Sequence, residues 1–147
     1  MDCVFCSVIS KETPAHLVFE DESTVAFLDR SPVFLGHTLV VPKGHVKLLW
    51  ELGDGELANL TKKVKIISLA IQKSLGCDGV FVANNNNVSQ SVPHVHFHVI
   101  PRSFGDGLKG FFWPRRRYGL NEAESYASLI GRGIDAVAYP SAESADG

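Results

Sequence analysis

His94-Val95-His96-Phe97-His98-Val99-Ile100 alternates imidazole and apolar side chains. Successive side chains of a β-strand point to opposite faces, so this stretch predicts a strand with its three histidines on one face and its apolar residues toward the core. Histidines spaced about 6.6–7 Å apart along one strand can reach a single small ligand. Alternating histidines also suit a zinc site, and a polar strand face needs no ligand, so the pattern leaves these alternatives open.

The sequence around this stretch predicts an α+β fold. Short strands bounded by turn residues are expected at Leu17–Glu20, Thr24–Leu28, His37–Val41 and Gly79–Ala83. Asp54–Leu75 has apolar residues at three- and four-residue steps and is followed by Gly76, which predicts one long amphipathic helix. The order of strands, one long helix and further strands favours a mainly antiparallel, five-stranded sheet over an alternating doubly wound fold.

The C-terminal part is expected to add a shorter helix at Glu122–Ile130. We therefore expect one domain over residues 1–140 and a loose tail over residues 141–147.

The composition excludes several classes of protein. A chain of 147 residues can bury one sizeable core, and its formal net charge of −2 argues against a protein that coats nucleic acid or an anionic membrane. No signal-peptide pattern opens the chain, and no run approaches the roughly 20 apolar residues of a membrane span. Three cysteines do not suggest a disulfide framework. We therefore expect a cytoplasmic protein that binds neither nucleic acid nor membrane.

The segments flanking the histidine strand carry a wider resemblance. Gln90-Ser91-Val92-Pro93 leads into the strand and Pro101-Arg102 closes it, while Phe27–Pro32 and Gly36–His45 precede it. In order and spacing these segments resemble the histidine-triad (HIT) family, whose signature is H-φ-H-φ-H-φ-φ with φ apolar. The resemblance covers roughly residues 3–102 and points to Hint- or Fhit-like nucleotide hydrolases or transferases, in the zinc-binding branch of bacterial type.

The resemblance implies catalytic roles for three histidines. His96 would attack the α-phosphorus of a nucleotide and form a nucleotidyl-histidine, which water or another acceptor resolves. A neutral imidazole is a competent nucleophile near pH 7, and its other ring nitrogen must then be held by an acceptor. His98 would contact the phosphate or the leaving group, and His37 would support the site from a neighbouring strand.

The resemblance also implies substrate contacts. Asp29 would hold the ribose hydroxyls, Gln90 and Ser91 would contact the phosphate and leaving group, and one of Asn84, Asn85 and Asn86 would contact phosphate. Ser89 stands where a glycine is common in the family's phosphate loop. Trp113 would reach a partner subunit's active site, as a C-terminal Trp-Pro does in the Hint branch. Walls of a base slot are expected from Phe5, Ile9, Phe27 and Leu39, although each also suits a plain core.

Cys3 and Cys6 form a C-x-x-C pair, which is half of a zinc site. Some family members and the related galactose-1-phosphate uridylyltransferases complete such a pair with histidines that match His45 and His94. The resemblance thus implies structural Zn²⁺, with His94 bracing the strand instead of binding phosphate. A redox C-x-x-C is the alternative, although it normally opens a helix after a strand and does not begin a chain.

The expected function is hydrolysis or transfer at the α-phosphate of purine nucleoside phosphoramidates or related nucleotides. The alternatives are a dinucleoside polyphosphate hydrolase or phosphorylase, and a nucleotide-binding sensor of low turnover. Family members are commonly homodimers, so a homodimer is expected. The apolar face of the long helix agrees with this, but it would equally well cover its own sheet.

Overall fold

The computed structural model describes residues 2–108 and 114–138. They fall into two compact units, Met1–Gly107 and Leu108–Gly147. The single domain expected over residues 1–140 stays a prediction, and the tail expected over residues 141–147 lies outside the described residues.

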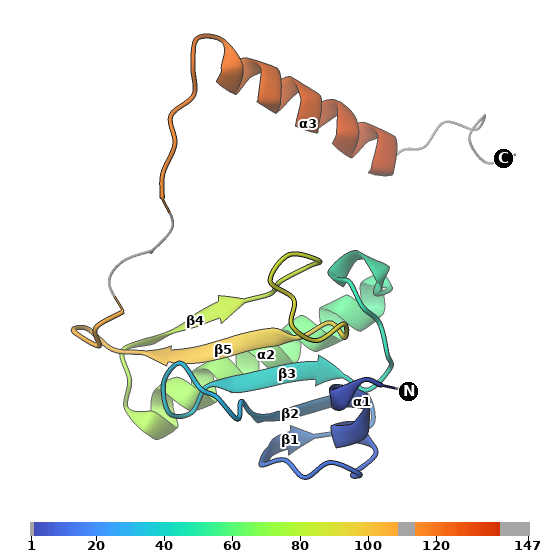
Figure 1. The fold of residues 1–147 in the computed structure, drawn as a ribbon, viewed down its shortest axis with the longest axis vertical. Helices are drawn as coiled ribbons and strands as arrows, with labels where there is room; N and C mark the ends of the chain where they lie inside the picture. Colours follow the sequence, from blue (N-terminus) through green and yellow to red (C-terminus); the bar gives the residue numbers. More distant parts are fainter. Residues whose placement is uncertain (1, 109–113, 139–147) are drawn as a thin grey trace, which may run out of the picture. The chain divides into compact units, whose positions relative to one another are not determined.

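The first unit is built on one sheet (Figure 1). Its strands lie in the order β1-β2-β3-β5-β4, and each strand is antiparallel to its neighbours. The strands are β1 (Leu17–Glu20), β2 (Thr24–Leu28), β3 (Thr38–Pro42), β4 (Gly79–Ala83) and β5 (Phe97–Arg102). The predicted α+β class with a five-stranded antiparallel sheet is confirmed.

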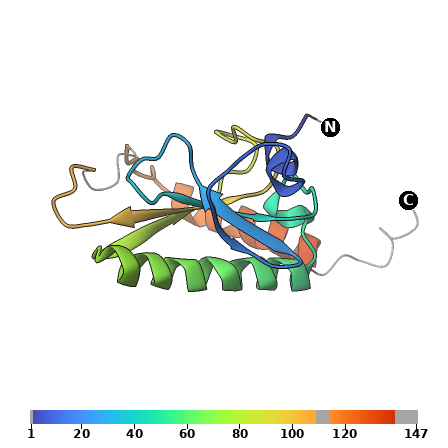
Figure 2. The ribbon, with the colours of Figure 1, turned by 90° about the horizontal axis from the view of Figure 1, so that it is seen from below.

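Helix α2 (Asp54–Leu75) covers one face of the sheet, and α1 (Val4–Ile9) lies on the other (Figure 2). A short 3-10 turn, η1 (Leu49–Glu51), precedes α2. The predicted bounds of α2 are confirmed, and Gly76 ends it in the left-handed conformation at φ +65°. The helical spacing predicts one apolar face of six residues, of which Leu60, Val64, Ile67 and Ile71 are buried, whereas Leu57 is partly buried and Leu75, at the end of the helix, is exposed.

The sheet is buried on both faces at its centre because successive strand residues point to opposite sides. In β2, Ala26 joins the core under α2, whereas Val25 and Phe27 join the core under α1. Phe5 of α1 packs edge-on against Phe27, with ring centroids 5.4 Å apart. The short N-terminal helix is thereby held against the sheet beside the histidines.

The strand predicted over residues 94–100 was wrong in its bounds, because β5 begins at Phe97 and extends to Arg102. His94 lies in the irregular segment before the strand, where its ring bonds to Pro42 instead of standing free on a face. The predicted alternation of faces holds for the apolar residues, because Val95 and Val99 are fully buried in the core under α2. His96 also precedes the strand, and only His98 belongs to it.

The second unit contains α3 (Glu122–Ala138). It is shorter than α2, as predicted, but it continues eight residues beyond the predicted end at Ile130. Gly131 and Gly133 do not end it because neither adopts a positive φ, and Ile134 and Val137 continue the apolar spacing. Among the described helices, none is long and apolar enough to cross a membrane.

Gly36, directly before His37, has a backbone conformation that favours glycine. Its φ is +99°, and an added Cβ would lie 2.6 Å from Cδ1 of Leu75. We expect Gly36→Ala to lower the free energy of unfolding by about 1–2 kcal/mol, measured by urea titration. Gly55→Ala, in the first turn of α2 with open space around it, is the control and should leave stability unchanged or slightly raised. Equal stability of the two variants would contradict this.

Candidate active site and metal site

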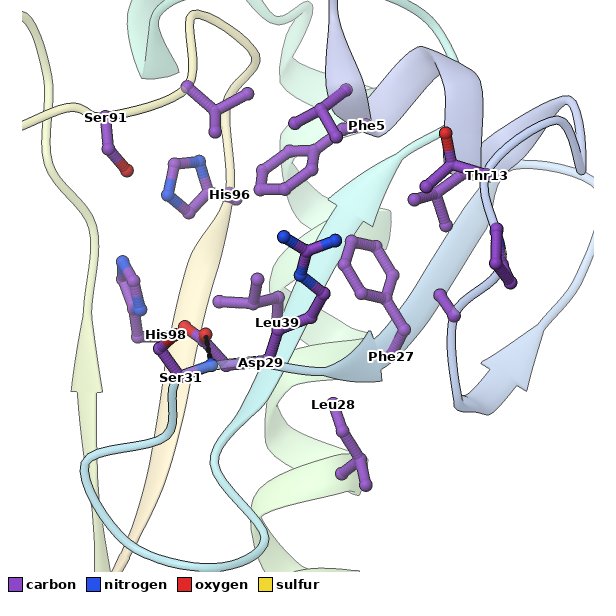
Figure 3. Close-up of a pocket in the computed structure, with 16 residues that line it drawn as sticks. Phe5, Thr13, Phe27, Leu28, Asp29, Ser31, Leu39, Ser91, His96 and His98 are labelled. Atoms are coloured by element: carbon purple, nitrogen blue, oxygen red, sulfur yellow. Dashed lines mark hydrogen bonds between the residues drawn. The ribbon is translucent and has the colours of Figure 1, made fainter.

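Neighbouring strands bring the histidines that were predicted to be catalytic together beside a cavity of about 240 Å³ (Figure 3). His98 in β5 pairs with Leu39 in β3, and His37 immediately precedes β3. His96 and His98 line the cavity, with ring centroids 4.9 Å apart. The lining of the cavity is therefore partly polar. It is also partly apolar and includes Phe5, Phe27 and Leu39 from the expected base slot, whereas Ile9 does not line it.

The hydrogen bonds of His96 place its proton. Its Nδ1 lies 2.8 Å from the carbonyl oxygen of His94. A carbonyl can only accept, so Nδ1 carries the proton and Nε2 keeps its lone pair. Burial lowers the pKa of His96, which keeps the ring neutral near pH 7. The residue predicted as nucleophile thus has an unprotonated nitrogen available for attack.

His37 and His98 form a second hydrogen-bonded chain. The backbone N–H of Val33 donates to Nδ1 of His37, 3.1 Å away, so the proton of this ring lies on Nε2. Nε2 of His37 then donates to Nδ1 of His98 at 3.0 Å. The proton of His98 is consequently on its own Nε2. Burial, with the neighbouring His96 and His37 rings, lowers the pKa of His98 to about 4, so it is a neutral donor.

Two predicted substrate residues line the same cavity as the histidines. Asp29 accepts from the backbone N–H of Ser31 at 2.8 Å, and its other oxygen lies 3.6 Å from Nε2 of His37. Ser91 lies across the cavity, on the loop before β5. The ribose and phosphate contacts expected of these residues stay predictions.

The remaining predicted substrate residues lie on the loop between β4 and β5. Gln90 donates to the carbonyl of Lys47 at 2.7 Å and accepts from the backbone of Asn87. Asn84 and Asn86 bond to each other. Asn85 is half-buried beside them. Their phosphate contacts stay predictions, and Trp113 lies outside the described residues.

Sequence reasoning missed two functional groups at this site. Arg30 is the one permanent cation among the described residues lining the cavity, and its place next to Asp29 was the available signal. The backbone N–H of Val33 carried no signal, because a main-chain donor is common to almost every residue and only its location by His37 gives it a role.

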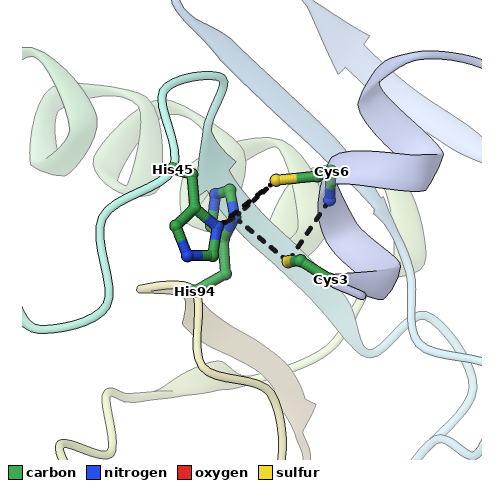
Figure 4. A group of neighbouring side chains, drawn as sticks. All are labelled: Cys3, Cys6, His45 and His94. Carbon is green, nitrogen blue, oxygen red and sulfur yellow. Dashed lines mark hydrogen bonds between the residues drawn. The ribbon is translucent and has the colours of Figure 1, made fainter. Parts of the chain in front are cut away.

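A second group of side chains could hold a metal ion (Figure 4). Sγ of Cys6 lies 3.3 Å from Nδ1 of His45 and 3.6 Å from Nδ1 of His94, and Sγ of Cys3 lies 3.5 Å from the same nitrogen of His94. The two Nδ1 atoms are 3.2 Å apart. Nε2 of His94 donates to the carbonyl of Pro42, which leaves the lone pair of Nδ1 facing the cluster.

These spacings fit a tetrahedral ion. With zinc bond lengths of about 2.3 Å to sulfur and 2.05 Å to nitrogen, the edges of the tetrahedron would be about 3.6 Å for S···N and about 3.35 Å for N···N. Two thiolates and two imidazoles also suit a borderline-soft cation. The four residues predicted as ligands, Cys3, Cys6, His45 and His94, are those that the fold brings together.

Asp29, His37 and His98 also bring three donor groups close together, but their hydrogen bonds argue against a metal there. A metal on Nε2 of His37 would force the ring proton onto Nδ1, where it would face the N–H of Val33. His37 and His98 are better described as a hydrogen-bonded relay, with Asp29 3.6 Å from Nε2 of His37.

A model of the HIT domain matches residues 10–105. The chain belongs to the HIT family. A HIT-like protein of Methanocaldococcus jannaschii is 50% identical over 122 residues, which are 82% of this chain and 94% of the relative. An adenosine 5′-monophosphoramidase of Schizosaccharomyces pombe is 35% identical, covering 91% of this chain and 99% of the relative. An adenylylsulfatase of Arabidopsis thaliana is 38% identical, covering 89% of this chain and 68% of the relative.

Solved HIT structures share the fold. A HIT family protein from Bacillus subtilis superimposes with a TM-score of 0.82 at 34% identity, covering 90% of this chain and 96% of that one. A zinc-bound histidine triad protein from Mycobacterium smegmatis superimposes with a TM-score of 0.70 at 33% identity, covering 90% and 98%. Both likenesses extend over nearly the whole of this HIT chain.

The hydrogen-bonded relay predicts an unusual titration in this HIT protein. We expect the His98 ring to titrate near pH 4, as followed by ¹⁵N NMR, because burial and its neighbours disfavour the charged form. The unfolded chain binds this proton near pH 6.5, so protonation favours unfolding and stability falls as the pH drops from 6.5 toward 4. A midpoint near 6.5 for the His98 ring would overturn the assignment.

Proposed function

We propose that this HIT protein is a nucleotide hydrolase or transferase that acts at the α-phosphate of purine nucleoside phosphoramidates or related nucleotides. The observation that carries the proposal is the hydrogen bond from Nδ1 of His96 to the carbonyl of His94, since it leaves Nε2 unprotonated beside the cavity. The named activities of the S. pombe and A. thaliana relatives support a nucleotide substrate.

The cavity suggests how a nucleotide would lie. Its apolar lining, which includes Phe5 and Phe27, suits a base, because an aromatic face contacts a planar ring without needing a polar partner. Asp29, which also lines the cavity, suits the ribose hydroxyls, which a carboxylate binds by charge-assisted hydrogen bonds. The α-phosphate would then lie beside His96 and His98.

The two histidines would divide the chemistry. Nε2 of His96 forms a bond to the α-phosphorus as the bond to the leaving nitrogen breaks, and that nitrogen departs as an amine with a proton taken from water. The neutral His98 ring keeps its Nε2 proton and donates a hydrogen bond with it to the phosphate or the leaving group, while Nε2 of His37 holds the ring by donating to Nδ1. Water then attacks the phosphorus as the bond to His96 breaks, and the proton it releases balances the one taken up by the amine. The sum is hydrolysis of the phosphorus–nitrogen bond.

Zn²⁺ is the proposed occupant of the site formed by Cys3, Cys6, His45 and His94. With four protein ligands it leaves no open position, so it would brace the structure and take no part in the chemistry. His94 links this site to the nucleophile, because its ring faces the cluster while its carbonyl accepts from His96. The residue predicted as a brace would therefore also orient His96.

A dinucleoside polyphosphate is the second candidate substrate, and Arg30 is the observation that favours it. This guanidinium lines the cavity next to Asp29, where it could pair with a further phosphate. Hydrolysis of diadenosine tri- or tetraphosphate faster than of adenosine phosphoramidate would decide for it. The cytoplasmic location and the homodimer stay predictions, and light scattering of the full chain tests the second of them.

His96→Ala should lower the hydrolysis of adenosine phosphoramidate by about 10⁴-fold or more, since it removes the proposed nucleophile. The measurement is AMP release, and mass spectrometry of quenched wild-type enzyme should show one nucleotidyl group on His96. His16→Ala, an exposed histidine, is the matched control and should keep wild-type activity. Equal rates for wild type and His96→Ala would end the enzyme hypothesis.

The purified chain should contain one zinc ion per molecule by elemental analysis. Cys6→Ser should lose the ion and lower the unfolding midpoint by about 10 °C or more, because the binding free energy of a structural metal stabilises the fold. Cys77→Ser is the control, since this thiol lies outside the cluster and donates to the main-chain carbonyls of Ile71 and Gly79. A metal-free chain of full stability would contradict the proposal.

A further inference from the structure

The backbone of His96 lies outside the paired regions that join β5 to its two neighbours, β3 and β4. The ladder between β3 and β5 ends at the pair Val40 and Phe97, and the ladder between β4 and β5 ends at Ala83 and His98. His96 precedes both pairs, so the regular sheet does not hold the residue that must be placed most accurately. A displacement of about 1 Å in a reacting group can slow a reaction by about 10²-fold.

A side-chain amide binds the backbone of His96 at the point where β4 ends. Asn84 directly follows Ala83, the last residue of β4, and its Nδ2 donates to the carbonyl oxygen of His96 at 2.8 Å. This bond continues the pairing of the two strands by one further step, with a side-chain amide in place of a backbone N–H. His96 is thus held at two points, at its ring by His94 and at its carbonyl by Asn84.

Asn84 is itself oriented by a second amide. Nδ2 of Asn86 donates to Oδ1 of Asn84 at 2.5 Å, and Oδ1 of Asn86 accepts from the backbone N–H of Leu49 at 2.8 Å. The two side chains form an unbroken run of hydrogen bonds from η1 to the nucleophile. Because each amide has its oxygen accepting and its nitrogen donating, neither can rotate without losing bonds at both ends.

We propose that Asn84 is a positioning residue for His96, with Asn86 orienting it, and that the pair acts on the attack step and not on nucleotide affinity. The proposal rests on the proposed function, since it assigns Asn84 to the same nucleophile. It differs from the phosphate contact expected of one of these asparagines, because the bonds of Asn84 and Asn86 are directed at protein groups.

The test separates binding from chemistry. In Asn84→Ala, the dissociation constant for AMP, measured by calorimetry, should stay within about threefold of wild type. The single-turnover rate of nucleotidyl transfer to His96 from adenosine phosphoramidate should fall by about 10- to 100-fold. Gln72→Ala is the matched control, because this amide also donates to a main-chain carbonyl, that of Asp78, away from the cavity. It should change neither quantity.

Asn86→Ala is the second variant in this test. It should slow the same step by a smaller factor, and the double variant should be no slower than Asn84→Ala, because both residues act through one bond to His96. If Asn84→Ala lacks a cooperative unfolding transition, Asn86→Ala alone still tests the proposal. Its transfer rate must then fall without a matching loss of AMP affinity.

Three outcomes would overturn the positioning role. A loss of AMP affinity equal to the loss of rate would make Asn84 a phosphate ligand. A wild-type transfer rate in both single variants would show that the amides have no effect on the attack step. Fully additive effects in the double variant would exclude action through one shared bond. Failure of the proposed function looks different, since it would appear as equal rates for wild type and His96→Ala.

Discussion

The hydrogen bond from His96 to the carbonyl of His94 is the interaction on which the site depends. It decides which ring nitrogen of His96 is free, and it does so through a residue whose own ring faces the cysteine and histidine cluster. The ring of His94 is tied on its other side to Pro42, the last residue of β3. One residue therefore connects the sheet, the cluster that could hold a metal, and His96.

Three histidines that look equivalent in the sequence differ because their acceptors and donors differ. His94 gives Nε2–H to one carbonyl, His96 gives Nδ1–H to another, and His98 receives a proton donor at Nδ1 from His37. A neutral imidazole has one donor and one acceptor, so each fixed bond leaves one nitrogen with a definite role. By the same logic, the cysteine and histidine cluster offers lone pairs that could hold a metal, whereas His37 and His98 satisfy each other by a hydrogen bond.

The burial of the histidines supports these different roles. His94 and His96 are almost fully buried, and desolvation lowers the pKa of each, so both rings are neutral at physiological pH. Phe5 covers them from α1, with its ring centroid 5.0 Å from that of His96. The same aromatic side chain also lines the cavity. The short N-terminal helix therefore contributes to the core, to the cavity and to the environment of His96.

The sequence by itself determined the elements with strong local patterns. Helical spacing and Gly76 bounded α2, apolar runs between turn residues located the strands, and the four residues of the candidate metal site followed from the family resemblance. Only the tertiary structure decided that His94 and His96 precede β5, which ring nitrogens are free, and where the amide of Asn84 points. The reason is physical: periodicity reports which face a side chain takes, whereas ring tautomers and strand ends depend on main-chain donors and acceptors that distant segments supply.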